Sequence, residues 1–371
     1  MKILHTADLH IGAELSYLDR TSDARQYEVL EVFKNITELC QEQSVDICII
    51  AGDLFDSNKA GKPFAKAVFD YIAAACGTLF FCIAGNHDPL DAASPYVTEK
   101  LPENLKVFGP EYEQVVIEKL GVRICGRSFA HSSMEFSPLP YLADDGLVNI
   151  LISHSDLGIS SGGYNPLPYN VIENIGADYI ALGHIHKRTT IEKLGSSFIA
   201  YPGCPEGQGF DEEGVKGVYI GELEKGVCKM EFYPTSKRVH TVKKIDLSEA
   251  QSTEDAEKII LESLKNDVVG EVSQNLYKLV LSGVNEDPSR IDMPLLHSRL
   301  TGKLYFVKMK NEVKQKLDLE SISKEVSLRG IFVSKMLDKI AAAEEDDKKP
   351  LAQALYLGLE AFDSEVAYNE D

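Results

Sequence analysis

Short apolar runs that stop abruptly at polar residues recur along the first half of the chain. The five clearest runs cover residues 2–6, 47–51, 78–84, 148–152 and 179–182. Strands this uniformly apolar are typical of a sheet that is covered on both faces. Between the first three runs, apolar residues recur every three or four positions, which predicts amphipathic helices near residues 23–43 and 63–75. The alternation of strand and helix predicts a largely parallel α/β sheet with right-handed crossovers.

The pattern changes twice farther along the chain. Between residues 105 and 129, short runs alternate apolar and polar positions, which predicts antiparallel strands in a second sheet layer. Near residues 235–244 the pattern restarts as a small α/β unit, and after about residue 319 it becomes helical. We therefore predict three domains, which cover residues 1–238, 239–318 and 319–371.

The polar residues that follow the five apolar runs are of a restricted kind. They are aspartate, histidine and asparagine: Asp8 and His10, Asp53, Asn86 with His87, His154, and His184 with His186. Open α/β sheets place their functional sites at the carboxyl ends of strands, so we expect these side chains to converge. Residues two apart in an extended segment share a face, so both His184 and His186 can point to the site.

These residue types are typical ligands of a pair of divalent metal ions. Two ions about 3.5 to 4 Å apart can hydrolyse a phosphate ester, because they activate water, neutralise phosphoryl charge and stabilise the leaving oxygen. A carboxylate has to bridge them, and Asp53 is our candidate. We assign the other ligands to two groups, which are Asp8, His10 and His186 on one ion, and Asn86, His154 and His184 on the other. Mixed nitrogen and oxygen ligands favour manganese, iron or zinc over calcium.

Three residues beside these ligands are candidates for supporting roles. His87 follows a ligand and cannot comfortably bind the same ion, so we predict that it acts on the substrate phosphate or protonates the leaving group. Asp88 is a candidate for orienting a ligand histidine, as is Asp56, for which a turn or cap is an equal alternative. The remaining histidines do not share the pattern, and we treat them as structural: His5, His131, His240 and His297.

Each of these motifs is weak by itself. An isolated Asp-x-His or Gly-Asp is usually structural, and Asn-His after a glycine is most often a turn. The metal-site interpretation depends on the conjunction, because all five occur in order and each follows an apolar strand.

The overall charge restricts how the chain could bind nucleic acid. With 58 acidic against 38 basic residues, the net charge is −20, which disfavours capture of nucleic acid by global positive charge. Such binding would have to be local. The candidate basic residues lie in two groups, at positions 237–244 and 303–316, for which solvated charged faces are the alternative interpretation.

Cysteine use and hydropathy indicate a cellular compartment. The seven cysteines include no CxxC pair and several lie inside apolar runs, as is typical of buried thiols in a reducing environment. The first apolar run is followed at once by polar residues, unlike a signal peptide, and no run approaches the roughly 18 apolar residues of a membrane span. We predict a cytoplasmic protein that does not associate with membranes.

Taken in order, the motifs match a known family. Asp8-Leu9-His10, Gly52-Asp53, Gly85-Asn86-His87-Asp88, His154 and Gly183-His184-Ile185-His186 resemble the signature of the calcineurin-like metallophosphoesterases. Within that family the chain resembles the SbcD-type DNA repair exonucleases, especially a YhaO-like bacterial branch. That finer resemblance is carried by residues 5–10, 52–56, 182–187 and 201–203 and by the carboxyl-terminal extension.

The resemblance implies a fold, an activity and partners. It implies a four-layer α/β/β/α sandwich with a small α/β capping domain, two manganese ions, and hydrolysis of DNA phosphodiesters with His87 acting on the substrate. It also implies that the C-terminal helices dock on a coiled-coil ATPase of the SbcC type. The far C-terminal helices depart from the family pattern. The sequence contains no GxxxxGK[ST] motif, so any ATP would be bound by a partner. A homodimer is left open.

Three functions remain distinct hypotheses. The first is a metal-dependent DNA nuclease, exonuclease or endonuclease. The second is a phosphodiesterase or phosphatase for small molecules or nucleotides, which the same metal site would serve, although such a substrate needs no long C-terminal region. The third is an architectural subunit with a vestigial metal site, against which the intact set of ligands argues.

Overall fold

The computed structural model describes residues 1–134, 138–159, 164–265 and 270–363. Contacts divide the chain into two compact units. The first consists of Met1–Lys243, Asp267–Lys278 and Thr301–Lys308, and the second of Lys244–Asn266, Leu279–Leu300 and Met309–Asp371.

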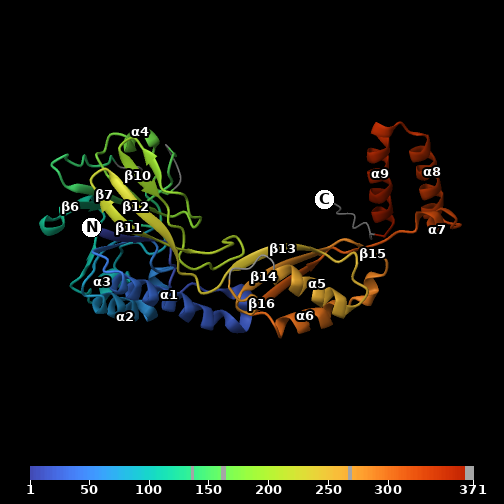
Figure 1. Cartoon of the computed structure of the whole chain (residues 1–371), viewed down its shortest axis with the longest axis horizontal. Helices are drawn as coiled ribbons and strands as arrows, with labels where there is room; N and C mark the ends of the chain where they lie inside the picture. The colour runs from blue at the N-terminus through green and yellow to red at the C-terminus, as the bar shows by residue number, and fades with distance from the viewer. Residues whose placement is uncertain (135–137, 160–163, 266–269, 364–371) are drawn as a thin grey trace. The chain divides into compact units, whose positions relative to one another are not determined.

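The first sheet of the first unit contains the three leading strands of the chain. Its order is β12-β11-β1-β2-β3-β4. The strands are β1 (Lys2–Thr6), β2 (Ile47–Ala51), β3 (Leu79–Ile83), β4 (Leu105–Val107), β11 (Gly217–Glu224) and β12 (Val227–Pro234). The first four run parallel, and β11 and β12 add antiparallel strands beside β1. The helices α1 (Ser22–Glu42) and α2 (Asn58–Ala74) cover one face of this sheet (Figure 1).

A second sheet of six strands packs against the first. Its order is β5-β6-β7-β8-β10-β9. The strands are β5 (Glu113–Ile117), β6 (Val122–Gly126), β7 (Val148–His154), β8 (Tyr179–Gly183), β9 (Glu192–Leu194) and β10 (Ser197–Ala200). The expected antiparallel pair is β5 and β6, while β6, β7, β8 and β10 are parallel. The short helix α4 (Tyr169–Ile172) packs on the outer face. The predicted α/β class is confirmed.

Alternate side chains of the central strands enter two different cores. In β2, Cys48 and Ile50 face α1 and α2, whereas Ile47 and Ile49 face the second sheet. Because side chains alternate along a strand, a strand buried on both sides is apolar at most positions. This requirement explains the continuous apolar runs in the sequence. It also leaves the strand ends as the places where polar groups can gather.

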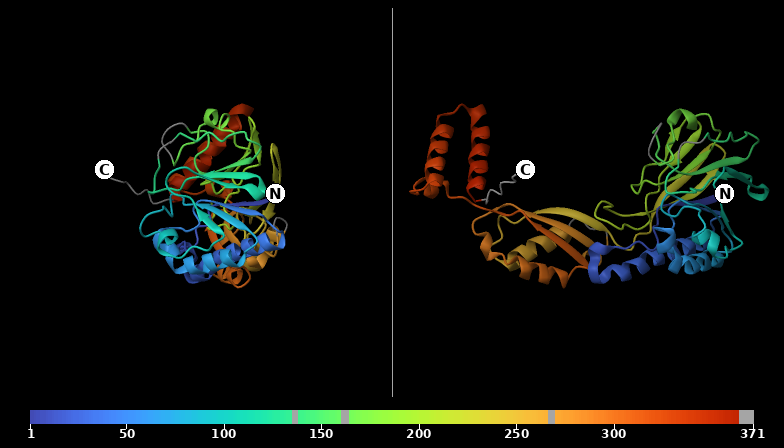
Figure 2. Two further views of the ribbon diagram at one scale, coloured as in Figure 1. Left: turned by 90° about the vertical axis from the view of Figure 1, so that its left-hand side faces the viewer. Right: turned by 180° about the vertical axis from the view of Figure 1, so that it is seen from behind.

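The elements after residue 238 are one small sheet, a pair of very short strands and several helices. A three-stranded sheet has the order β13-β14-β16, formed by His240–Asp246, Leu276–Ser282 and Phe306–Asn311. The helices of this region are α5 (Thr253–Lys265), α6 (Met293–Thr301), α7 (Leu319–Ser323), α8 (Leu328–Ala342) and α9 (Glu345–Asp363). Figures 1 and 2 show α8 and α9 side by side, and Val333, Leu355 and Leu359 form their shared core. Residues 364–371 of the predicted C-terminal segment lie outside the described residues.

Candidate metal centre

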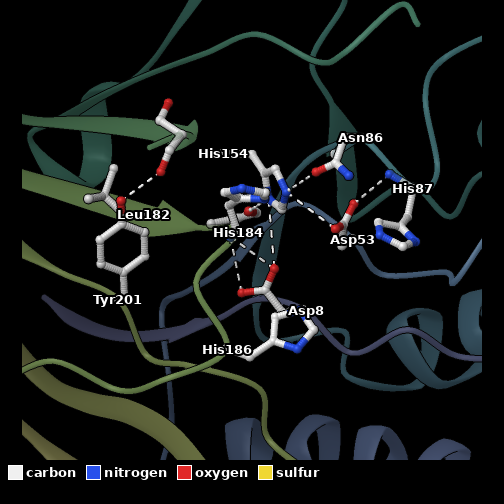
Figure 3. Close-up of polar contacts among 12 residues, drawn as sticks. Asp8, Asp53, Asn86, His87, His154, Leu182, His184, His186 and Tyr201 are labelled. Atoms are coloured by element: carbon white, nitrogen blue, oxygen red, sulfur yellow. Dashed lines mark hydrogen bonds and ion pairs between the residues drawn. The ribbon is translucent and has the colours of Figure 1, made fainter. Parts of the chain in front are cut away.

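The ends of five strands from both sheets deliver the predicted ligands to one place. Asp8 and His10 follow β1, Asp53 follows β2 and Asn86 follows β3, while His154 ends β7 and His184 and His186 follow β8. Figure 3 shows Asp8, Asp53, Asn86 and His154 pointing toward one another. Asp8 and His154 are fully buried, and Asp53 is 1% exposed. The convergence expected from the sequence therefore requires both sheets, not one.

The backbone at this site is held in conformations that most residues avoid. In the described part of the chain, six non-glycine residues have a positive φ, and four of them are predicted ligands: Asp8 (55°), His10 (47°), Asp53 (50°) and His184 (100°). Backbone hydrogen bonds fix this arrangement, from the Asp8 N–H to Gly52 O and from the His10 N–H to Asp53 O. Backbone strain of this kind costs of order 1–3 kcal/mol per residue and gathers at functional sites.

Two glycines of the motifs allow the strand ends to approach closely. A Cβ on Gly183 would lie 1.9 Å from Ala51 O, and one on Gly85 would lie 2.1 Å from Asp53 Oδ1. No side chain fits at either position. The glycines that precede Asn86 and His184 are therefore required by packing.

The first predicted group brings together Asp8, His10 and His186. The Nε2 atoms of His10 and His186 lie 3.0 Å apart. The other nitrogen of each ring faces a carboxylate, since His10 Nδ1 lies 3.5 Å from Asp56 Oδ1 and His186 Nδ1 contacts Glu212 Oε1. A carboxylate accepts a hydrogen bond from Nδ1, which leaves Nε2 as the nitrogen of each ring that can bind a cation once it is unprotonated.

This pair of facing nitrogens fits a divalent cation. With both rings neutral, these two nitrogens are acceptors and cannot hydrogen-bond to each other, whereas a cation bound between them would satisfy both lone pairs. With ligand distances of about 2.1 Å and a right angle between ligands, two nitrogens of one ion would be about 3 Å apart. The donor set of imidazoles and carboxylate suits such an ion.

Asp53 lies between this group and the second one. Its Oδ2 is 3.7 Å from His10 Nε2 and 3.3 Å from His154 Nε2. His154 Nε2 also lies 2.9 Å from Asn86 Oδ1, while its Nδ1 bonds to Ala51 O. His184 lies at the edge of the second group, with its backbone N–H donating to Asp8 and its Nε2 3.3 Å from Asp156 Oδ1. One carboxylate oxygen thus faces both groups, as a bridging ligand must.

Comparison with known proteins identifies the family. The profile described as calcineurin-like phosphoesterase matches residues 1–188. The chain belongs to the calcineurin-like phosphoesterase family. This is a family of hydrolases that bind divalent metals.

Three relatives are similar to this chain over much of its length. It is 30% identical over 267 residues to the uncharacterized metallophosphoesterase YhaO of Bacillus subtilis, a match that covers 68% of this chain and 64% of YhaO. It is 27% identical to the DNA double-strand break repair protein Mre11 of Methanopyrus kandleri, over 61% of this chain and 55% of that protein. It is 26% identical to SbcD, a component of the nuclease SbcCD of Staphylococcus epidermidis, over 66% of this chain and 72% of that protein. The first two matches therefore span less than two thirds of those relatives.

The electrostatics of the ligand cluster suit a cation. Burial by itself raises the pKa of Asp53, but the charges of His154 and His10 outweigh burial and hold that pKa below its usual value. Burial lowers the pKa of His154, but Asp53 and Asp8 outweigh it and raise the pKa to about 9. Asp53 is therefore ionised, and a cation that arrives at His154 displaces a proton.

His87 lies at the open side of the site. Its side chain is 47% exposed, and its ring lies perpendicular to that of His10 with centroids 4.6 Å apart. Its backbone N–H donates to Asp53 Oδ1, and its Nδ1 lies 3.0 Å from the carbonyl oxygen of Asp56. His87, His10 and Asp56 line an open pocket of about 230 Å³. The ring of His87 therefore lies at the open pocket, and its backbone is hydrogen-bonded to Asp53, the residue that faces both ligand groups.

The two predicted supporting carboxylates have different partners. Asp56 lies beside His10, as expected for an orienting residue. We predicted that Asp88 orients a histidine, but the structure gives it the N–H groups of Gly85 and Phe55 and the hydroxyl of Tyr96. Because Asp88 lies three residues after Gly85 in the same turn, its carboxylate accepts from that turn's backbone. Burial and the charge of Asp53 raise the pKa of Asp88 to about 7.

Two carboxylates at the site escaped the sequence analysis. Glu212 contacts His186, and Asp156 contacts His184. Burial raises the pKa of Glu212, but hydrogen bonds from His186 and the Gln208 N–H outweigh burial and lower it to about 2. Asp156 follows His154 by two residues, which is a signal that could have found it. Glu212 lies 26 residues beyond His186, where no motif points to it.

Proposed function

We propose that this chain is a metal-dependent nuclease that hydrolyses DNA phosphodiester bonds, as exonuclease, endonuclease or both, in DNA repair. The observation that carries the proposal is the position of Asp53, one oxygen of which faces both ligand groups. Relatives named as Mre11 and as part of a nuclease support DNA as the substrate.

The residues of the site would hold two divalent ions. One would bind to Asp8, His10 and His186, the other to Asn86, His154 and His184, with Asp53 shared. Manganese is our proposal for both ions, with iron and zinc as alternatives suited to the same donors. When bound, such ions supply an activated water and neutralise phosphoryl charge.

His87 would act directly on the substrate. Because Nδ1 of His87 faces a carbonyl oxygen, that nitrogen carries a proton and Nε2 is free to face the pocket. In the imidazolium form, the Nε2–H would donate to a phosphoryl oxygen or to the leaving alkoxide. General acid catalysis of this kind contributes about 10²- to 10⁴-fold in rate.

A small-molecule phosphodiesterase or phosphatase is the second candidate. Two observations favour it. The pocket includes the acidic residues Asp211 and Glu212, and four of the basic residues considered for DNA binding are already paired with acids. Those pairs are Lys237 with Glu31, Arg238 with Glu28, Lys310 with Glu312 and Lys316 with Glu286. The long C-terminal region favours the nuclease.

Partners of the proposed nuclease follow from its helices. Among the described residues of α8 and α9, Leu328, Ile331 and Leu357 are 77%, 53% and 66% exposed. An apolar helical pair of this kind suits docking on a coiled coil, and we propose an ATPase subunit of the SbcC type, with DNA as the shared substrate. Among the described residues, no helix is both long and apolar enough to cross a membrane.

The experiment that tests this function compares cleavage by three proteins. Labelled single- and double-stranded DNA is incubated with manganese and the wild type, Asp53→Ala or His87→Ala, with and without the partner ATPase. We expect cleavage by the wild type and its loss in both variants, while a change at the exposed His131, His131→Ala, leaves it intact.

The same proteins distinguish the nuclease from a small-molecule phosphodiesterase and from an architectural subunit. Hydrolysis of bis(p-nitrophenyl) phosphate without cleavage of any DNA would favour the small-molecule enzyme. Metal analysis that finds no bound ion in the manganese-treated wild type would favour the architectural subunit.

A further inference from the structure

The carboxylate of Glu212 holds two partners at once. Its Oε1 contacts Nδ1 of His186, and its Oε2 accepts the backbone N–H of Gln208 at 2.6 Å. A carboxylate accepts hydrogen bonds and donates none. Nδ1 of His186 therefore carries the ring proton, and Nε2 carries the lone pair.

That lone pair faces the first group of ligands. His186 Nε2 lies 3.0 Å from His10 Nε2, where we place one ion. A histidine binds a metal through an unprotonated nitrogen, and the hydrogen bond at the other nitrogen decides which one that is. With the proton on Nε2 instead, His186 would direct a positive N–H at the ion.

The segment that leads to Glu212 is fixed at two points. The side chain of Gln208 donates to Leu9 O at 2.7 Å, and Leu9 lies between the ligands Asp8 and His10. Two residues before Gln208, Glu206 is paired with Arg25 at 2.6 Å, and neither side chain is exposed. Glu212 therefore approaches His186 from a rigid support.

We propose that Glu212 is a positioning residue that selects the metal-binding tautomer of His186. The inference rests on the proposed metal centre and deepens it. It assigns to residue 212 a role that no spacing in the sequence indicates.

The substitution Glu212→Gln separates this role from a structural one. A glutamine offers one acceptor and one donor. The Gln208 N–H can only donate, so the amide oxygen has to face it and the NH₂ has to face His186 Nδ1. Nδ1 must then accept, which moves the ring proton to Nε2, the nitrogen that should bind the ion. In Glu212→Ala, a water molecule can either donate a hydrogen bond to Nδ1 of His186 or accept one from it. His186 can then still adopt the tautomer that binds the ion.

We would titrate the full-length proteins with Mn²⁺ by calorimetry in the absence of DNA. We expect Glu212→Gln to weaken manganese binding about 10- to 100-fold, and Glu212→Ala to weaken it less. The control is Glu213→Gln, which makes the same change of charge at an exposed neighbour whose carboxylate accepts the Val242 N–H. This control should bind manganese as the wild type does.

If Glu212 only supported the structure, we would expect the opposite order of manganese affinities. Glutamine keeps the hydrogen bond to the Gln208 N–H, whereas alanine loses it. The proposal is overturned if alanine is the more damaging change, if Glu212→Gln binds manganese like the wild type, or if the wild type binds none. A wild type that binds manganese but leaves DNA intact contradicts the nuclease alone.

Discussion

At the scale of single residues, buried histidines divide by what surrounds their two nitrogens. Those at the metal centre face carboxylates and the site, whereas His5 lies between the sheets with Nδ1 2.8 Å from the Tyr179 hydroxyl and Nε2 3.1 Å from Leu182 O. The carbonyl requires a proton on Nε2, so Nδ1 accepts from the tyrosine. His5 is therefore a neutral cross-link between β1 and β8.

This environment predicts a stability that falls in acid. Burial lowers the pKa of His5 to about 3 from an ordinary 6.5, against a smaller opposing effect of the bond to Leu182. Above pH 6.5 the residue is neutral in both states. As pH falls from 6.5 toward 3, residue 5 binds a proton in the unfolded chain but not in the folded chain. The free energy of unfolding therefore falls by about 1 kcal/mol per pH unit.

Urea unfolding between pH 7.5 and 5 checks this expectation. The loss of stability should be shallower in His5→Gln than in the wild type, because glutamine supplies the same donor and acceptor without titrating. His131→Gln, at an exposed position, should retain the wild-type slope. Equal slopes in all three proteins would contradict the assignment.

At the scale of elements, the metal centre depends on how closely two strand ends meet. The end of β8 reaches the end of β2 at Gly183, where Ala51 O occupies the space that a side chain would need. Through Asp8, which follows β1, the bonds from the Asp8 N–H to Gly52 O and from the His184 N–H to the Asp8 carboxylate link these two strand ends. The sheets are thus joined through the ligand-bearing turns as well as through the apolar core.

A methyl group at this contact should therefore damage both the fold and the site. We expect Gly183→Ala to lower the free energy of unfolding by about 1–3 kcal/mol, as overpacking does, and to weaken manganese binding. Gly77→Ala is the matched control, because nothing lies within 4 Å of the added carbon. Urea unfolding and manganese titration measure the two effects, and a Gly183→Ala protein that matches Gly77→Ala in both would refute the argument.

At the scale of the whole molecule, the compact unit that holds the metal centre includes residues from far along the chain. Leu276 packs with Leu15 and Leu18, and Phe306 packs against the same cluster. Arg238 donates to Gln274 O at 2.6 Å. The predicted boundary at residue 238 remains a prediction, but a chain cut there would lose these contacts.

We expect a chain truncated after residue 238 to melt roughly 10 °C below the full chain. The estimate takes about 1.5–3 kcal/mol for each of the two exposed leucines and about 2–4 °C for each kcal/mol. A chain truncated after residue 318 keeps every one of these contacts and loses only α7, α8 and α9. Its first unit should melt as in the full chain. Equal melting temperatures for the two truncations would show that residues 276 and 306 contribute nothing.

The sequence by itself determined the main strands and the α/β class, and it predicted the ligands. It could do so because a strand buried on both faces is apolar at most positions, so that polar residues such as Asp53 and His154 gather at or just after its end. Only the tertiary structure decided which carboxylate orients which histidine. Glu212, Asp156 and Asp88 reach their partners across turns and loops, where no periodicity ties sequence separation to distance. The periodicity of helices and strands relates residues that are close in sequence. A hydrogen bond that selects a tautomer depends instead on where the fold places a single atom of a distant residue.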